Sequence, residues 1–283
     1  MKAKSDCIAC MFRQALNTTR MVVDDPEMEL EVLRRLAGRV LDMDVEDTPA
    51  GLSMPVYEIV SELTGVKDPF RERKEESNRT ALDLEPGLRK RIEKSSDPLD
   101  AALHAGAAGN IIDLGIHLEF DIEADTGRIM DQAFALSDID AFRNEIKPGR
   151  KALFVGDNAG EIVFDKFLVG QVRDAGVDVV YSVKSGPIIN DSTMDDAVMA
   201  GMPELAGVIE TGSNDIGVNW DRVSDEFRRE FESAYFIVAK GHGNFETCND
   251  RPENIYFLLK AKCDMVAREL GVKVGDIVFR KFN

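Results

Sequence analysis

The segment GDNAGE places Asp157 and Asn158 directly after the apolar run KALFV, and Asp191 lies in the later segment IIND. Carboxylate and amide oxygens are hard ligands that suit Mg²⁺, Mn²⁺ or related divalent cations better than Zn²⁺. A cation bound there would reverse the local charge, so that an acidic turn could accept a phosphoryl group. The pattern therefore predicts a divalent-metal site formed by Asp157, Asn158 and Asp191.

The segment KGHGNFE adds a positive charge and backbone donors. Lys240 follows the apolar run YFIVA, and glycines flank the next residues, so that backbone N–H groups are open to an anion. Lys240 and these amides would stabilise charge that develops on a transferred phosphoryl group, and Glu161 is a candidate base for an attacking water. We predict catalytic roles for Asp157, Glu161 and Lys240.

Two routes of attack remain open for such a site. A water activated by the metal attacks phosphorus directly, or a carboxylate such as Asp157 or Asp191 attacks and forms a phospho-enzyme. The direct route is favoured, because a residue that holds a metal is poorly placed to act as the nucleophile as well.

Each polar segment follows a short apolar run of the kind that forms a buried strand. From Lys151 onward the runs KALFV, VDVVYSV, GVIE and YFIVA alternate with amphipathic stretches, and IYFLLK and DIVFRKF are compatible with further strands or with a helix. This alternation predicts βαβ units around a parallel sheet, whose ligands collect at the carboxyl ends of the strands. Asp, Asn, Ser and Gly also serve turns and helix caps, so it is their recurrence after four strands that favours a site.

The first half of the chain has a different periodicity. In PEMELEVLRRLAGRVLDMD the apolar residues Met28, Val32, Leu33, Leu36 and Val40 fall on one helical face. We therefore predict a mostly helical N-terminal lobe over 1–147 and an α/β metal- and phosphate-binding core over 148–283. The boundary would lie in NEIKPGRK.

Four motifs together resemble the damage-control metal-dependent phosphatases, of which one branch carries the name acidic residue methyltransferase. They are GDNAGEIVFD, the pair Asn190–Asp191, KGHGNFE, and AGAAGNIIDLG around Asn110 and Asp113. The resemblance extends from Cys7 to Glu246. It implies a Rossmann-like three-layer α/β/α core with a mostly parallel sheet, joined to a helical lobe. It also implies hydrolysis of small phosphorylated metabolites, such as sugar phosphates, with Mg²⁺, Mn²⁺, Co²⁺ or Ni²⁺.

The resemblance also assigns roles to residues. It places the metal ligands at Asp157, Asn158 and Asp191 and the phosphate-binding lysine at Lys240. The residues that we expect to line the substrate cavity are Asn78, Asn110, Asp113, Ser185, Lys240, Gly241, Gly243, Asn244 and Glu246.

The cysteines leave two interpretations open. Cys7 and Cys10 have CxxC spacing, typical of the prokaryotic branch, and could form half of a metal-thiolate site or a redox pair if Cys248 and Cys263 came close. Residues three apart on a helix share a face, however, so packing alone explains the pair, and packing is favoured.

Composition excludes several classes of function. A formal charge of −17 argues against broad attraction to nucleic acid or to anionic membranes. The sequence contains no long apolar span and no signal peptide, so we expect a cytoplasmic protein whose partner is a small metabolite, of undetermined oligomeric state. Two alternatives remain: an S-adenosylmethionine-dependent carboxyl methyltransferase, although GxGxG is missing from GDNAGE, and a module that binds a phosphometabolite without catalysis.

Overall fold

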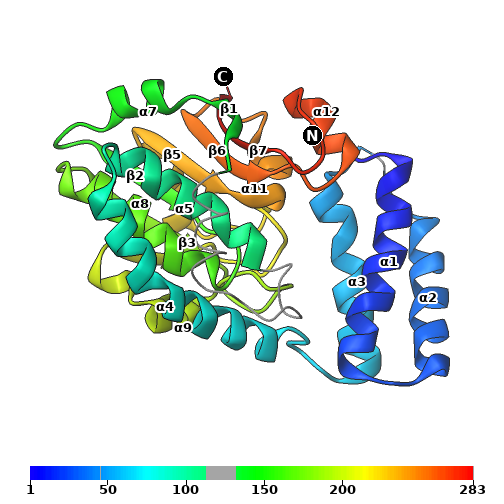
Figure 1. Cartoon of the computed structure of the whole chain (residues 1–283). Coiled ribbons are helices and arrows are strands. Elements are labelled where there is room, and N and C mark those ends of the chain that lie inside the picture. Colours follow the sequence, from blue (N-terminus) through cyan, green and yellow to red (C-terminus); the bar gives the residue numbers. More distant parts are fainter. Residues whose placement is uncertain (45, 113–131, 283) are drawn as a thin grey trace.

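Three helices at the N-terminus form a separate bundle with its own core (Figure 1). The structure is a computed structural model that describes residues 1–44, 46–112 and 132–282. The bundle contains α1 (Ser5–Val22), α2 (Pro26–Val40) and α3 (Pro49–Thr64). Asp25 and Thr48 cap α2 and α3 by accepting backbone N–H groups, and a proline at the first helical position follows each cap.

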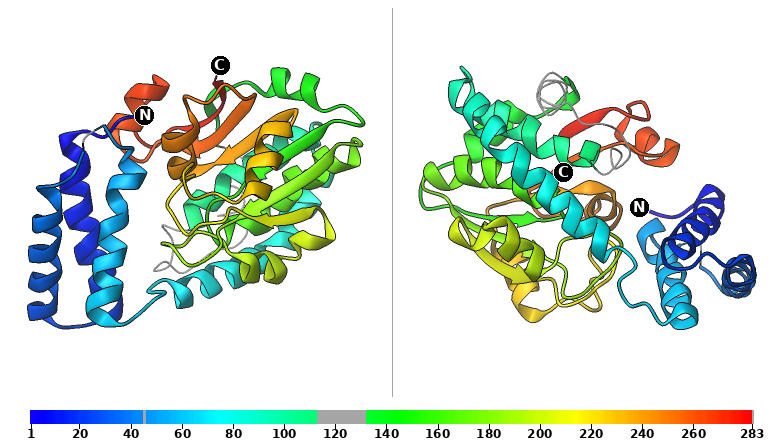
Figure 2. Two further views of the ribbon diagram at one scale, coloured as in Figure 1. Left: turned by 180° about the vertical axis from the view of Figure 1, so that it is seen from behind. Right: turned by 60° about the horizontal axis from the view of Figure 1, so that its bottom comes forward.

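The rest of the described chain builds a sheet covered by helices on both faces (Figures 1 and 2). Its elements are α4 (Arg71–Lys94), α5 (Pro98–Ile112), β1 (Phe134–Ser137), α7 (Ile139–Glu145), β2 (Lys151–Val155), α8 (Glu161–Asp174), β3 (Asp178–Val183), α9 (Met194–Ala200), the 3₁₀ turn η1 (Met202–Glu204), β4 (Gly207–Glu210), α10 (Asp225–Ser233), β5 (Phe236–Lys240), α11 (Gly241–Cys248), β6 (Ile255–Lys260), α12 (Asp264–Leu270) and β7 (Ile277–Phe282).

The strands form one sheet in the order β1-β7-β6-β5-β2-β3-β4. All neighbouring pairs are parallel except β6 and β7, which are antiparallel. Alternation along β2 shows the two faces, because Phe154 packs with α4, α5 and α8, whereas Leu153 and Val155 pack with α10, α11 and α12. Because β2, β3, β5 and β6 run parallel to one another, their carboxyl ends meet at one edge of the sheet.

The predicted fold class is confirmed: the chain has a mostly parallel sheet between helical layers, plus a helical lobe. The predicted runs form β2 to β5, and IYFLLK and DIVFRKF are the strands β6 and β7. The domain division near residue 148 stays a prediction. The helices α1 to α3 share one hydrophobic core, whereas α4 and α5 pack on the sheet and β1 pairs with β7. The boundary between the two hydrophobic cores therefore lies between α3 and α4.

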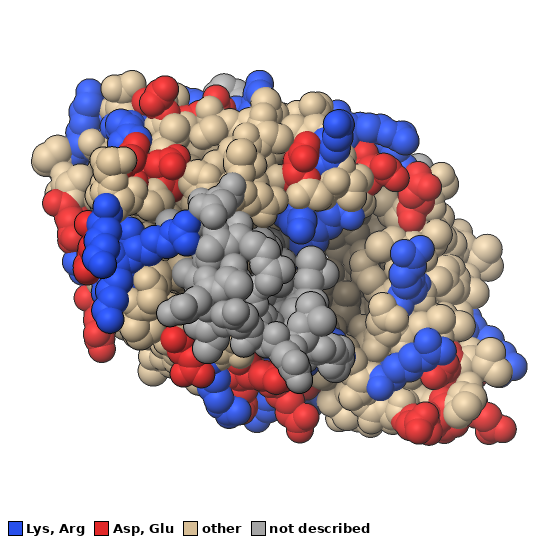
Figure 3. Space-filling model, viewed as in Figure 1, with Lys and Arg blue, Asp and Glu red and all other residues tan. Residues whose placement is uncertain are grey.

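The carboxyl edge of the sheet faces the helical lobe. Figure 3 shows a hollow between the two on the face seen in Figure 1. From the lobe, Met54 of α3 accepts the backbone N–H of Ile216 at its sulfur, 3.4 Å away. Among the described helices, none is long and apolar enough to cross a membrane.

Candidate active site

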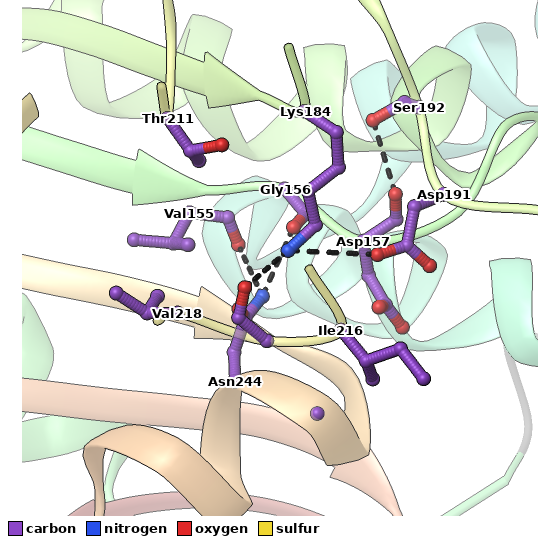
Figure 4. A network of polar contacts seen from close by, with 12 residues as sticks. Val155, Gly156, Asp157, Lys184, Asp191, Ser192, Thr211, Ile216, Val218 and Asn244 are labelled. Atoms are coloured by element: carbon purple, nitrogen blue, oxygen red, sulfur yellow. Dashed lines mark hydrogen bonds and ion pairs between the residues drawn. The ribbon is translucent and has the colours of Figure 1, made fainter. Parts of the chain in front are cut away.

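The loops after β2 and β3 are joined at the carboxyl edge by backbone hydrogen bonds. The N–H of Ser192 donates to the carbonyl of Asp157 over 2.7 Å, and the N–H of Ala159 donates to the carbonyl of Asn190 over 2.8 Å. The hydroxyl of Ser192 also donates to the Asp157 carbonyl (Figure 4). Asn158 and Asp191 thereby form an isolated β-bridge, which brings the three predicted metal ligands together.

The amide of Asn158 links the two acidic residues of its own turn. Its Nδ2 donates to Oδ2 of Asp157 over 3.1 Å and to Oε1 of Glu161 over 2.7 Å. Asn158 and Glu161 are buried, with 5% and 1% of their surface exposed, whereas Asp157 is partly exposed. The turn thus leaves the carboxylate of Asp157 partly exposed, whereas the carboxylate of Glu161 is buried behind the amide of Asn158.

Lys184, the residue after β3, holds Asp191 in place. Its Nζ lies 3.6 Å from Oδ2 of Asp191 and also donates to the carbonyl of Gly217 (Figure 4). Burial raises the pKa of the Asp191 carboxyl to about 6, although Lys184 opposes the shift. Burial also raises the pKa of Asp157, and the charges of Glu161 and Asp191 add to that rise.

The charges of this cluster do not balance. The carboxylates of Asp157, Glu161, Asp165 and Asp191 lie with two buried ammonium groups, Lys184 and Lys240. With the exposed ammonium of Lys262, whose charge also acts on Asp157 and Asp191, four carboxylates face three ammonium groups among the described residues. One negative charge is left when all seven groups are ionised, and a proton or a bound cation would neutralise it.

The donor set fits a hard divalent cation better than a soft one. Asp157 and Asp191 supply carboxylate oxygens, and Asn158, whose Nδ2 donates to Glu161, can offer its carbonyl oxygen to a ligand. No group of three His, Cys, Asp or Glu side chains is arranged to hold a metal among the described residues. A cation here would therefore complete its coordination with the asparagine and with water or substrate oxygens.

Lys240 lies behind the site, completely buried. Its Nζ donates to the carbonyl of Gly106 over 2.9 Å, to Oε2 of Glu161 over 3.1 Å and to Oδ1 of Asp165 over 2.6 Å. These acceptors use all three N–H groups of the ammonium. The geometry therefore favours a positioning role for Lys240 over the predicted contact with phosphate.

Glu161 is likewise enclosed. Its Oε1 accepts from Asn158 and its Oε2 from Lys240, and the side chain is 1% exposed. A general base needs an oxygen within reach of the water that it deprotonates. The arrangement thus favours Glu161 as the group that orients Asn158, rather than as the predicted base.

The predicted substrate-binding residues are distributed around the edge. Gly241 begins α11 directly beside the Asp157 carboxylate, and Gly243 packs against Gly217. Asn244 is buried, and its Nδ2 donates to the carbonyl of Gly156 (Figure 4). The same Nδ2 donates to the carbonyl of Lys240, while Oδ1 of Asn244 has no hydrogen-bond partner among the described residues. Ser185 is exposed, and its hydroxyl accepts the N–H of Gly212.

The other predicted residues lie further from the metal ligands or outside the described part of the chain. Asn78 of α4 is buried, donates to Asp196 over 2.7 Å and accepts the N–H of Gly160 over 2.6 Å. Its amide therefore connects α4 to the turn after β2. Glu246 of α11 faces the lobe, where its carboxylate accepts the backbone N–H of Ala50 in α3. The backbone of Asn110 is in α5, whereas its side chain and the whole of Asp113 lie outside what the structure describes.

Lys262, which follows β6, was not among the residues predicted from the sequence. Its charge lowers the pKa of both Asp157 and Asp191, so the ammonium lies near the two carboxylates while remaining exposed. The ring of His242 contacts this loop through Nε2, which either accepts the N–H of Lys262 or donates to the carbonyl of Lys260, each 2.8 Å away. Burial, followed by the charge of Lys262, lowers the pKa of His242 to about 4, so the ring is neutral at pH 7.

The lobe contributes Tyr57 of α3 to the opposite wall. Its hydroxyl donates to Oε1 of Gln14 over 3.1 Å. Burial, followed by the charge of Asp191, raises the pKa of the Tyr57 hydroxyl, which places the ring near the carboxyl edge. A cavity of about 570 Å³ between α4 and α5, lined by Lys90, Lys94 and His104 among others, lies elsewhere.

The cysteines lie on both sides of the contact between lobe and core. Cys7 is half-buried, with its Sγ 3.9 Å from Sδ of Met265, while Cys10 and Cys263 are exposed. Cys248 is buried in α11, and burial raises the pKa of its thiol to about 12. The four thiols are free in the structure.

Comparison with known proteins assigns the chain to a family. The model of the damage-control phosphatase ARMT1-like domain matches residues 3–278. The chain belongs to the damage-control phosphatase ARMT1-like family. It is 33% identical to a protein of Methanocaldococcus jannaschii over 99% of this chain and 96% of that protein. It is 32% identical to a damage-control phosphatase of Pyrococcus horikoshii over 98% of this chain and 97% of that one.

A solved structure of this family agrees with the fold. The crystal structure of a DUF89 family protein from Pyrococcus horikoshii superimposes with a TM-score of 0.92 at 31% identity, covering 100% of both chains. The recognised resemblance is therefore confirmed, and membership of the damage-control phosphatase family supports a phosphatase role.

Proposed function

We propose that this chain is a divalent-metal-dependent phosphatase that hydrolyses small phosphorylated metabolites, such as sugar phosphates. The observation that carries the proposal is the joining of Asp157, Asn158 and Asp191 by the paired loops after β2 and β3, in a cluster with more carboxylates than ammonium groups among the described residues. A site of this charge repels a phosphate unless a cation is bound between them. Family membership supports the same reaction class.

The oxygens of Asp157, Asn158 and Asp191 would hold the cation. When bound, a divalent cation supplies Lewis-acid polarisation of the phosphoryl group and lowers the pKa of a water. Lys184 keeps Asp191 ionised and directed to the edge through the 3.6 Å ion pair. Activity measured with Mg²⁺, Mn²⁺, Co²⁺ and Ni²⁺ in turn decides which cation serves best.

The phosphoryl group would be bound by Lys262 and by the N-terminus of α11. Lys262 is an exposed cation near the two carboxylates, and the backbone at Gly241 and Gly243 begins α11, whose N-terminus favours an anion. Both carboxylates at the edge hold the cation in this arrangement, so direct attack by water is favoured over a phospho-enzyme. Tyr57 and Gln14 would face the part of the substrate that carries no phosphate.

The test is release of phosphate from p-nitrophenyl phosphate and a panel of sugar phosphates. Chelated protein is compared with protein that receives each of the four metals. We expect release only with metal, and a loss of about a hundredfold or more in kcat for Asp157→Ala and Asp191→Ala. Asp174→Ala, an exposed acid at the end of α8 far from Glu161, is the control and should keep full activity. Folded wild-type protein that binds sugar phosphate with metal but never releases phosphate would instead be a binding module.

A further inference from the structure

A chain of buried polar groups runs from the interior of the sheet to the candidate metal ligands. The hydroxyl of Tyr181 in β3 donates to Oδ2 of Asp165 in α8 over 2.7 Å. Oδ1 of Asp165 accepts from Lys240, and Lys240 donates in turn to Glu161. Tyr181, Asp165, Lys240 and Glu161 are each at most 1% exposed.

Every oxygen of the two carboxylates in this chain has a protein donor. Asp165 accepts from Tyr181 and Lys240, and Glu161 accepts from Lys240 and Asn158. A carboxylate held at both oxygens cannot rotate without breaking a charge-assisted hydrogen bond. Burial lowers the pKa of Lys240, but the charges of Asp165 and Glu161 outweigh burial and raise it, so the ammonium stays charged.

The orientation of Asn158 depends on this chain. An ionised Glu161 can only accept, so it selects the orientation in which Asn158 presents Nδ2 to it and leaves the carbonyl oxygen for the cation. The opposite orientation would set two acceptors against each other inside the protein.

We propose that Asp165 and Tyr181 are positioning residues of this site, which act through Lys240 and Glu161 on the amide of Asn158. The proposal rests on the proposed metal-dependent phosphatase function. It explains why two carboxylates four residues apart on α8, Glu161 and Asp165, face one buried lysine.

The test uses two nearly isosteric variants, Tyr181→Phe and Asp165→Asn. Tyr181→Phe removes only the hydroxyl that donates to Asp165, and Asp165→Asn keeps the shape and removes the charge that anchors Lys240. The matched control is Tyr256→Phe, because the hydroxyl of Tyr256 is buried in the same sheet without a hydrogen-bond partner among the described residues. For each protein we would measure Mn²⁺ affinity by calorimetry, kcat and KM with p-nitrophenyl phosphate, and the thermal midpoint.

We expect both variants to bind Mn²⁺ about tenfold more weakly and to lose about tenfold in kcat at saturating Mn²⁺, with KM changed less than twofold. Tyr256→Phe should match the wild type in all three. Wild-type Mn²⁺ affinity and kcat in both variants would overturn the proposal, as would equal losses in Tyr256→Phe. Wild-type protein that binds Mn²⁺ without hydrolysing any phosphate ester would overturn the proposed function, while the Mn²⁺ affinities would still decide on the positioning role.

Discussion

The carboxylate of Asp157 lies directly against the α-carbon of Gly241, so that a β-carbon at residue 241 would overlap Oδ2 of Asp157. Gly241 also has a φ of +78°, which residues other than glycine rarely adopt. The first residue of α11 is therefore glycine for two separate reasons. The close approach brings the helix N-terminus next to the candidate metal ligand.

The variant Gly241→Ala should displace Asp157 and abolish Mn²⁺-dependent phosphatase activity. Gly201→Ala is a matched control, because Gly201 has a φ of +76° but a β-carbon there would have no described atom within 4 Å. Both variants should lose about 1 kcal/mol of stability from backbone strain, seen in thermal unfolding. Only Gly241→Ala should lose Mn²⁺ binding by calorimetry; retained binding would contradict the close approach.

Glu161→Gln separates a positioning role from a role as general base. The glutamate accepts at both oxygens, whereas glutamine has a single acceptor and an NH₂ group that must face either Lys240 or Asn158. We expect Mn²⁺ affinity to fall by about tenfold together with kcat. Retained affinity with reduced kcat would favour the base, and Glu226→Gln, an exposed change on α10, controls for loss of charge.

Much of this site could be predicted because its residues directly follow apolar strands. Asp157, Asn158 and Asp191 lie beyond β2 and β3, and parallel strands bring their carboxyl ends together whatever the details of packing. The strand β1 was not predicted, because FALS is only four residues long and has no clear periodicity. Whether the last two apolar runs were strands also stayed open.

The direction of side chains could not be predicted from the sequence. Lys240 ends β5, and the structure directs it to the face covered by α5 and α8, where Gly106 and Asp165 accept its donors. Lys262 follows β6 and stays exposed near Asp157. The only sequence signal for the buried ion pairs of Lys240 with Glu161 and Asp165 was the spacing of the two acids, four residues apart on one helix.

Lys262 offers a test of phosphate binding. Lys262→Ala should lower kcat/KM for p-nitrophenyl phosphate by about tenfold or more, because it removes the exposed cation near the two edge carboxylates. Its charge lowers the pKa of Asp157 and Asp191, so the loss should be greater at pH 6 than at pH 8. Lys262→Arg should retain most of the activity, and Lys273→Ala, an exposed change after α12, should retain all of it. Unchanged kcat/KM in Lys262→Ala would exclude the contact.

Glu246 gives the contact between core and lobe a dependence on pH. Burial raises the pKa of its carboxyl from 4.5 to about 7, although the N-terminal ammonium and the backbone N–H of Ala50 in α3 oppose the shift. The folded protein therefore binds a proton more tightly than the unfolded chain, and the stability that this proton supplies is present at low pH. It is lost as the pH rises from about 4.5 to 7, by about 3 kcal/mol in total.

Glu246→Gln should remove this part of the pH dependence, because glutamine stays neutral and can still accept the N–H of Ala50. The measurement is the free energy of unfolding in urea at pH 5 and at pH 8, for the wild type, Glu246→Gln and the exposed control Glu232→Gln. The wild type and the control should lose the same amount of stability between the two pH values, and Glu246→Gln should lose about 2.5 kcal/mol less, since part of the total change falls outside this interval. An equal loss in all three proteins would show that Glu246 is ionised in the folded protein across this range, and that the Ala50 contact does not depend on its protonation.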